Sequence, residues 1–186
     1  SDTRNTIMLF VMGATGRMGG AVLRHAAGKT RAASRSGHPV PGANETARFD
    51  LEDSATHAAA LDGCTALFAM RPPPSLSRAP FEALFETACQ AGVRHLICAS
   101  VYGAEGSRVL PHRHMEAAAR DSGIAYTFLR PADFMQNLGD VHGARIRETD
   151  EIVVPAGKGR SAFLDVEDVG HACAMILPGM RDRAVT

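Results

Sequence analysis

The chain has 186 residues, of which 45% are hydrophobic and 22% charged, a composition typical of one globular domain with a sizeable core. Lys plus Arg and Asp plus Glu both number 20, so the formal net charge is zero and no basic excess indicates a nucleic-acid partner. The apolar run at residues 7–12 is far too short to cross a bilayer, and we expect no membrane partner.

The chain contains four cysteines, at positions 64, 89, 98 and 173. They form no Cys-x-x-Cys pair, and each has apolar neighbours. We therefore expect small buried hydrophobic residues in a reducing compartment, and hence a cytoplasmic protein. No set of ligands has the spacing of a metal site, so we expect none.

Short apolar runs alternate along the chain with segments of helical periodicity. Strands are expected at residues 7–12, 30–34, 46–49, 66–70, 95–99 and 125–129. Helices are expected at residues 16–27, 54–61, 81–91, 111–121 and 166–177. This alternation predicts an α/β fold with a doubly wound parallel sheet, covered by helices on both faces. In such sheets, the loops at the carboxyl ends of the strands form the ligand crevice.

A glycine-rich turn, Gly13-Ala14-Thr15-Gly16-Arg17-Met18-Gly19, lies between the first expected strand and the first expected helix. Gly13 permits a tight turn, Gly16 lets the backbone approach a pyrophosphate, and Gly19 lets the helix pack close to the sheet. Amide groups at the helix start then face the phosphates. The motif in this context predicts a Rossmann-type dinucleotide site.

The residues after the second expected strand indicate which dinucleotide is bound. NAD-binding folds usually place a carboxylate there to bind the ribose hydroxyl, but no Asp or Glu occurs between Asp2 and Glu45. Arg35 lies at that position, and its planar guanidinium suits a 2′-phosphate. Arg17 and Ser34 are further candidates, and we expect NADP(H) to be preferred over NAD(H).

Asp50 and Leu51 follow the third expected strand. An acid at this place suits a hydrogen bond from the adenine amino group. It equally suits the start of the next helix, near Asp53 and Ser54, and both interpretations stay open.

The chain resembles the NmrA-like, atypical short-chain dehydrogenase/reductase group over nearly its whole length. The resemblance rests on the glycine turn and on segments 49–53, 61–68, 91–95, 122–131, 134–137 and 163–169. The stretch from His112 to Glu116 is similar to a subgroup that contains NADPH:quinone oxidoreductases and triphenylmethane reductase. Members of the group are usually longer than this chain.

The resemblance implies a set of site residues. Those at the cofactor phosphates would be Gly13, Thr15, Gly16, Arg17, Met18 and Gly19, with Arg35 at the 2′-phosphate and Asp50 and Leu51 at the adenine. Those flanking the ribose and nicotinamide would be Ala69, Met70, Arg71, Ser100, Val101 and Tyr102, with Pro131 opening a loop over residues 131–134 that closes on the nicotinamide. We expect a single NAD(P)-binding domain over residues 1–186. Its residues 132–165 would contribute to a small substrate-side subdomain, incomplete in this chain.

The Tyr-x-x-x-Lys pair of ordinary short-chain dehydrogenases is absent. The chain has Tyr102, Tyr126, Lys29 and Lys158, and no Lys stands four residues after a Tyr. Tyr102 and His112 are therefore the candidate proton donors or orienting groups, with a loop aromatic and a helix-start histidine as the respective structural alternatives.

Two further residues are candidates on the substrate side. Phe134 would form an apolar wall of the pocket. Asn137 either faces the pocket or caps its own segment.

A site without the Tyr/Lys pair suits an acceptor that delocalises the incoming charge. We therefore expect an NADPH-dependent reductase of quinone-like or other conjugated, apolar acceptors. The alternative is a non-catalytic, redox-sensing regulator that binds NADP(H); an isomerase or a reductase of another substrate class stays open behind them. The expected partner is a small apolar or conjugated molecule, and whether the chain forms a homodimer is left open.

Overall fold

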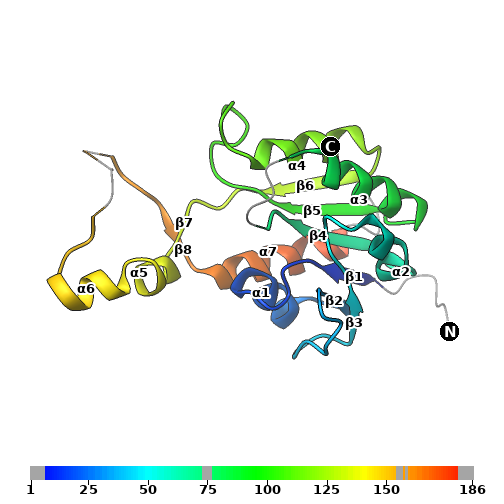
Figure 1. The fold of residues 1–186 in the computed structure, drawn as a ribbon, viewed down its shortest axis with the longest axis horizontal. Coiled ribbons are helices and arrows are strands. Elements are labelled where there is room, and N and C mark those ends of the chain that lie inside the picture. Colours follow the sequence, from blue (N-terminus) through cyan, green and yellow to red (C-terminus); the bar gives the residue numbers. More distant parts are fainter. Residues whose placement is uncertain (1–6, 73–76, 154–156, 158, 180–186) are drawn as a thin grey trace.

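Six parallel strands form one sheet in the computed structural model, which describes residues 7–72, 77–153, 157 and 159–179 (Figure 1). The strands are β1 (Met8–Val11), β2 (Lys29–Ser34), β3 (Glu45–Arg48), β4 (Ala66–Met70), β5 (His95–Ala99) and β6 (Ala125–Leu129). Their order is β3-β2-β1-β4-β5-β6, and every pairing is parallel. The chain leaves β1 toward β2 on one side and returns to β4 on the other, so the topological switch point lies between β1 and β4.

Helices cover both faces of this sheet. They are α1 (Arg17–His25), α2 (His57–Leu61), α3 (Ala79–Gln90), α4 (His112–Asp121) and α7 (Val166–Gly179), and a short 3₁₀ turn at Ser54–Thr56 precedes α2. Side chains of a strand alternate between the two faces: Phe10 packs with α2, α3 and α4, whereas Leu9 and Val11 pack with α1 and α7. The near-continuous apolar runs of the central strands are thus explained by burial on both sides.

Helices α1 and α7 approach each other closely, although their sequences are far apart. A Cβ atom added at Gly170 would lie 2.5 Å from the backbone oxygen of Ala21. Only a glycine therefore fits at this crossing. Arg24 and His25 of α1 also bond the carboxylate of Glu167 in α7.

The expected α/β fold and all six strands of the sheet are confirmed; the last three strands have the expected bounds, and the ends of the first three differ by at most one residue. The first helix begins at Arg17 and ends at His25, because Gly16 and Ala26 have non-helical backbone angles. Cys64, Cys98 and Cys173 are buried, but Cys89 is exposed on α3, which corrects the expectation that all four are buried.

Residues 133–164 contain elements that the periodicity did not predict. They are β7 (Asp133–Phe134), α5 (Gln136–Asp140), α6 (Gly143–Thr149) and β8 (Phe163–Leu164). β7 pairs with β8, so part of the segment expected as a closing loop is a strand. Of the expected substrate-side range 132–165, residues 154–156 and 158 lie outside the described part of the chain.

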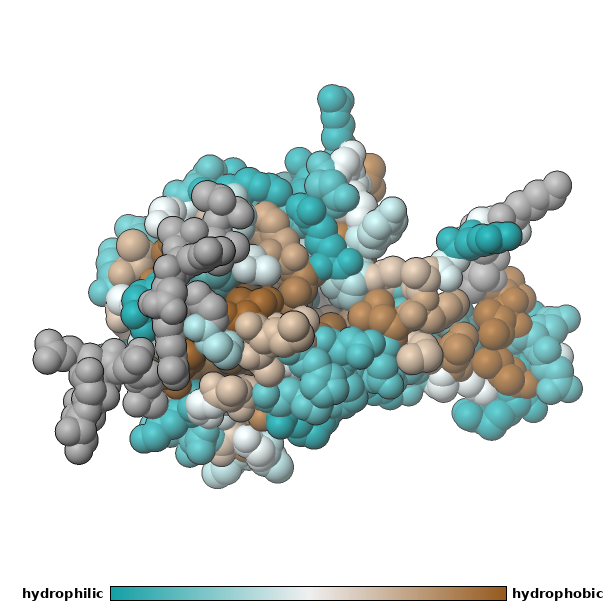
Figure 2. Space-filling view, turned by 180° about the vertical axis from the view of Figure 1, so that it is seen from behind, coloured by the Kyte–Doolittle hydropathy of each residue, from teal (hydrophilic) through white to brown (hydrophobic). Residues whose placement is uncertain are grey.

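This segment projects to one side of the sheet (Figure 1). It carries several half- to mostly exposed apolar side chains, and brown, apolar surface gathers over it in Figure 2. They are Met135, Val141, Ile152, Val153 and Phe163. In the described portion of the chain, no helix is both long and apolar enough to cross a membrane.

Candidate dinucleotide site

A crevice of about 730 Å³ opens at the carboxyl ends of β1, β2 and β4. This is the place where open α/β sheets bind ligands. Its walls come from four loops, which follow β1, β2, β3 and β4. The lining residues are Met12, Gly13, Thr15, Gly16, Ala33, Ser34, Arg35, Ser36, Phe49, Asp50, Leu51, Glu52, Met70 and Pro72.

The glycine turn forms one wall, and Gly13 and Gly19 have no room for a side chain. Gly13 has φ +63°, and a Cβ atom there would overlap the sulfur of Met70. A Cβ at Gly19 would overlap the carbonyl oxygen of Gly13 and lie 2.8 Å from Cα of Ala14. Gly13 and Gly19 are therefore required by close packing of the turn, the helix and β4.

Helix α1 begins directly behind this turn. Its N-cap residue, Gly16, makes no side-chain capping bond, and the first helical turn contains no acidic residue. The first amide groups of a helix lack intrahelical partners and carry partial positive charge. Since Thr15 and Gly16 line the crevice, this end of the helix fits a pyrophosphate.

Arg17 makes different contacts from those expected. Its guanidinium pairs with the carboxylate of Asp140 and lies 3.5 Å from the carbonyl oxygen of Gln136, both in α5. The side chain thus joins the start of α1 to the projecting segment. Met18, by contrast, is partly buried and packs against the core.

The turn after β2 places Ser34, Arg35 and Ser36 at the far end of the crevice. The hydroxyl groups of Ser34 and Ser36 lie 3.2 Å apart, and the Arg35 side chain is exposed. Glu52 also lines the crevice. This carboxylate was not among the predicted site residues, and it reaches the crevice from the loop after β3.

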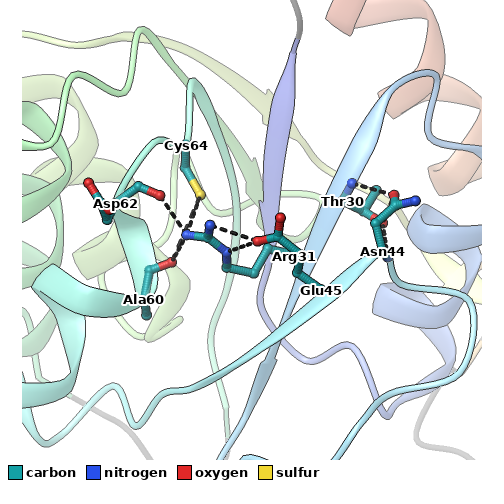
Figure 3. Close-up of polar contacts among 7 residues, drawn as sticks. All are labelled: Thr30, Arg31, Asn44, Glu45, Ala60, Asp62 and Cys64. Atoms are coloured by element: carbon teal, nitrogen blue, oxygen red, sulfur yellow. Dashed lines mark hydrogen bonds and ion pairs between the residues drawn. The ribbon is translucent and has the colours of Figure 1, made fainter.

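Arg31, in the same strand as Ser34, is committed elsewhere. Its guanidinium pairs with Glu45 at 2.7–2.8 Å and donates to the carbonyl oxygens of Ala60 and Asp62 at 2.9 and 2.6 Å. Figure 3 shows these contacts, together with one to the sulfur of Cys64. Arg31 therefore braces β2 against β3 and the loop before β4, and it does not line the crevice.

Asp50 and Leu51 lie in the crevice, beside the ring of Phe49. The backbone of Asp50 is held firmly: its amide donates to the Thr56 hydroxyl at 3.0 Å, and its carbonyl accepts from the His57 ring at 3.0 Å. The helix-start role belongs to Asp53, whose carboxylate accepts from the Ala55 amide. The Asp50 carboxylate accepts from the Glu52 amide and remains at the crevice wall.

The residues expected at the nicotinamide follow β4, β5 and β6, farther along the same sheet edge. Met70 lines the crevice, whereas Ala69 is fully buried within β4. Ser100 and Val101 follow β5, and the amide of Tyr102 donates to the carbonyl of Pro131 at 2.9 Å. The Tyr102 side chain is 73% exposed.

His112 begins α4 and is half-buried. Its Nδ1 atom is buried and has no hydrogen-bond partner among the described residues. Burial lowers the pKa of this imidazole, the nearby charge of Arg71 lowers it further, and Glu116 opposes the shift. The ring is therefore held in its neutral form at neutral pH.

On the substrate side, Phe134 is partly buried against the core, next to β8. Asn137 lies in α5, where its backbone oxygen accepts from the amides of Val141 and His142. No group of three or more His, Cys, Asp or Glu side chains in the described ranges is arranged to hold a metal.

Sequence reasoning missed one buried charged cluster. Glu116 is 1% exposed and bonds Ser100, Arg120 and Arg130. Ser100 was predicted to flank the nicotinamide, but no contact between it and Glu116, Arg120 or Arg130 was predicted. The signal available was a Glu in an otherwise Ala-rich buried helix face, with Arg130 directly after a strand.

A parallel sheet of this strand order, with a glycine cradle behind a helix start at its switch point, defines a Rossmann-type dinucleotide-binding protein. The family described as NAD(P)H-binding matches residues 13–177, and the chain belongs to it. The resemblance to the NmrA-like, atypical short-chain dehydrogenase group is confirmed.

The relatives include several reductases. The chain is 31% identical to the NAD(P)H azoreductase of Xenophilus azovorans, over 95% of this chain and 66% of the azoreductase. It superimposes on the Citrobacter sp. triphenylmethane reductase complexed with NADP(H) with a TM-score of 0.76 and 25% identity, over 92% of this chain and 65% of that one. The NADPH-dependent quinone oxidoreductase of Escherichia coli, complexed with NADPH, gives 0.77 and 25%, over 92% and 64%. The chain thus spans just under two thirds of these proteins' lengths.

Proposed function

We propose that this chain binds NADP(H) and acts in the transfer of a hydride to a quinone-like or other conjugated, apolar acceptor. The observation that carries the proposal is the crevice itself. A glycine-rich turn at a helix start lines one part of it, and an exposed arginine lines another. Both features suit the phosphates of a dinucleotide.

The residues present fit this cofactor part by part. The backbone at Gly13, Thr15 and Gly16 would hold the pyrophosphate, because these residues line the crevice at the start of α1, where the first helical amides lack intrahelical partners. Asp50 and Leu51 would contact the adenine, since the Asp50 carboxylate lies at the crevice wall and its backbone is fixed on both sides. When bound, NADPH supplies the hydride from its reduced nicotinamide.

Preference for NADP(H) over NAD(H) rests on Arg35. Its exposed guanidinium lines the crevice next to two serine hydroxyls and can form two parallel bonds to a 2′-phosphate. Arg31 is held in its own ion pair and hydrogen bonds and cannot serve in its place. The turn after β2 itself contains no carboxylate that would repel the 2′-phosphate, because Glu52 lies in the loop after β3.

The expected nicotinamide residues are proposed to surround the hydride-donating ring from the carboxyl ends of β4, β5 and β6. They are Met70, Arg71, Ser100, Val101 and Pro131, whereas Ala69, which is fully buried, would act only by packing β4 behind them. Arg17 would reach a phosphate only by breaking its ion pair with Asp140. It would therefore either bind the cofactor or hold the projecting segment. Met18 and Gly19 would act by packing the helix.

The acceptor class follows from the weak acid catalysis that the chain offers. The Tyr-x-x-x-Lys pair is absent from the sequence, and the lowered pKa of His112 favours a neutral ring. A quinone or an extended dye spreads the incoming negative charge, so it needs less help from a protein acid. Tyr102 and His112 are proposed as the hydrogen-bonding groups near it, and the apolar side chains of the projecting segment, with Phe134 and Asn137, as its surroundings.

The test is acceptor-dependent oxidation of NADPH, followed at the absorbance band of the reduced nicotinamide. The panel contains a small quinone, an azo dye and a cationic triphenylmethane dye. We expect turnover with at least one of them. His112→Gln should lower the rate, whereas the matched variant His114→Gln, two residues along the same helix, should not.

NADPH binding with no turnover on any of the acceptors would contradict the reductase proposal. That result would favour the non-catalytic regulator instead. Equal rates in the His112→Gln variant and the unchanged protein would remove His112 from the reaction while leaving the reductase proposal intact.

A further inference from the structure

Glu116 is a buried carboxylate that the proposed reaction does not use. It lies on the inner face of α4 and is 1% exposed. One carboxylate oxygen accepts from the Ser100 hydroxyl at 2.6 Å and from Arg130 Nε at 2.9 Å. The other accepts from Arg120 at 2.8 Å and from Arg130 at 2.7 Å.

These bonds keep Glu116 ionised inside the protein. Burial alone raises the pKa of a carboxyl group, but the bonds from Arg130, Ser100 and Arg120 outweigh it and hold the pKa of Glu116 below its ordinary value. A buried charge that loses such a partner strongly destabilises a protein, because the remaining charge is then uncompensated. The cluster is therefore a rigid, fully bonded unit.

The cluster joins two segments that begin at the carboxyl ends of neighbouring strands, β5 and β6. Ser100 is the first residue after β5, and Arg130 is the first residue after β6. The same two segments are linked by backbone bonds, from the Ser100 amide to the Leu129 carbonyl at 2.8 Å and from the Tyr102 amide to the Pro131 carbonyl at 2.9 Å. Glu116 thus holds, from behind, the loops that are proposed to flank the nicotinamide.

Glu116 also fixes the polarity of Ser100. A serine hydroxyl has one hydrogen to donate, and here it points to the carboxylate. Toward any other group, the Ser100 oxygen is an acceptor. The proton needed by a reduced acceptor therefore does not come from Ser100.

We propose that Glu116 is a positioning residue for the nicotinamide half of the cofactor, acting through Ser100 and Arg130. The inference rests on the proposed function. It assigns the two halves of the cofactor to different loops at the carboxyl edge of the sheet. The loops after β1, β2 and β3 bind the adenine half, and the Glu116 cluster orders the loops that receive the nicotinamide.

The test compares the affinities of NADPH and 2′,5′-ADP, which contains the adenine half alone, by calorimetric titration. The dissociation constant of 2′,5′-ADP divided by that of NADPH measures the contribution of the nicotinamide half, and it is larger when that half adds more affinity. In Glu116→Gln we expect NADPH binding to weaken roughly tenfold while 2′,5′-ADP binding is unchanged. The substitution weakens the charged bonds to Ser100 and Arg130, which lie beside the proposed nicotinamide site, and leaves the loops proposed for the adenine half untouched. Ser100→Ala, a milder change that keeps the buried charge paired with both arginines, should lower the same ratio.

The matched control is Glu105→Gln. It is the same substitution on another carboxylate next to Arg130, but this one is exposed and 3.4 Å away. Exposed ion pairs contribute little, so the ratio should stay at its original value. A double variant, Glu116→Gln with Ser100→Ala, should be scarcely worse than Glu116→Gln alone, because the two residues act in one chain of contacts.

Equal losses for NADPH and 2′,5′-ADP would show a general structural role and overturn the inference. An unchanged ratio in both Glu116→Gln and Ser100→Ala would overturn it while leaving the reductase proposal standing. If the unsubstituted protein binds 2′,5′-ADP and NADPH equally well, the nicotinamide half is not held at all and the inference fails. If it binds neither ligand, the cofactor assignment itself is wrong.

Discussion

Arg31 and Arg35 lie four residues apart and have opposite environments. Arg31 is tied into the fold by an ion pair and two carbonyl bonds, whereas Arg35 is exposed at the crevice. These contacts cannot be read from the sequence. The position of each arginine relative to the end of the strand nevertheless distinguishes the two: Arg31 is inside β2, and Arg35 is the first residue beyond it.

Replacing Arg35 tests its assignment to the 2′-phosphate. We expect Arg35→Glu to weaken NADPH binding on the order of tenfold to a hundredfold, because a bidentate attraction becomes a repulsion. NADH, which lacks that phosphate, should bind as before. Fluorescence titration of both cofactors measures the two affinities.

The control for this variant is Arg94→Glu. It makes the same change of charge on an exposed arginine directly before β5, at the opposite edge of the sheet. It should leave both affinities unchanged. Equal losses for NADPH and NADH in Arg35→Glu would refute the role given to Arg35.

At the scale of elements, the helix pair α1 and α7 depends on one small residue. The missing side chain of Gly170 lets α7 come within contact of the backbone at Ala21. Gly170→Ala should therefore destabilise the protein by about 1–3 kcal/mol, as overpacking in a tight core does. Urea unfolding followed by circular dichroism measures the change.

Gly139→Ala is the comparison at this scale. Gly139 lies in α5, where an added Cβ meets nothing within 4 Å. Alanine favours a helix over glycine by up to about 1 kcal/mol, so this variant should be as stable as the unsubstituted protein or slightly more stable. A Gly170→Ala variant that unfolds like Gly139→Ala would contradict the described packing.

Some elements were predictable from the sequence and others were not, for a physical reason. The six core strands and their helices carry apolar runs or a 3.6-residue period, and the glycine turn is a local motif with a local cause. β7 and β8 have two residues each, and α5 and α6 have five and seven, too short for any period. The Glu116 cluster joins residues 14 and 16 positions apart on three elements, and only the folded chain brings them together.

At the scale of the whole molecule, buried histidines tie stability to pH. Burial lowers the pKa of His95, which lies at the start of β5 and bonds Thr127 at 2.9 Å, and that of His112. The unfolded chain binds a proton more readily than the folded protein at both positions. As the pH falls below about 6.5, protonation therefore stabilises the unfolded state relative to the folded one. The free energy of unfolding should therefore be fully maintained above that pH and decrease below it.

The variant His95→Gln isolates one part of this effect. Glutamine retains a hydrogen bond to Thr127 but does not titrate. Urea unfolding at about one pH unit above and about one below 6.5 should show a smaller loss of stability in this variant. A loss identical to that of the unsubstituted protein would assign the dependence to other groups.

The sheet order, the glycine turn and the crevice together fit the proposed binding of one elongated ligand along this edge of the sheet. The crevice is proposed to hold its adenine half, and Glu116 joins the loops that are proposed to receive the other half. The projecting segment, with its exposed apolar side chains, adjoins this edge through Arg17 and Gln136. The central claim is therefore that this edge binds NADP(H).

The most direct measurement is an equilibrium titration of the 186-residue chain with NADPH and with NADH. We expect saturable binding of one NADPH per chain, clearly tighter than that of NADH. No binding of either cofactor, or equal affinity for both, would contradict it.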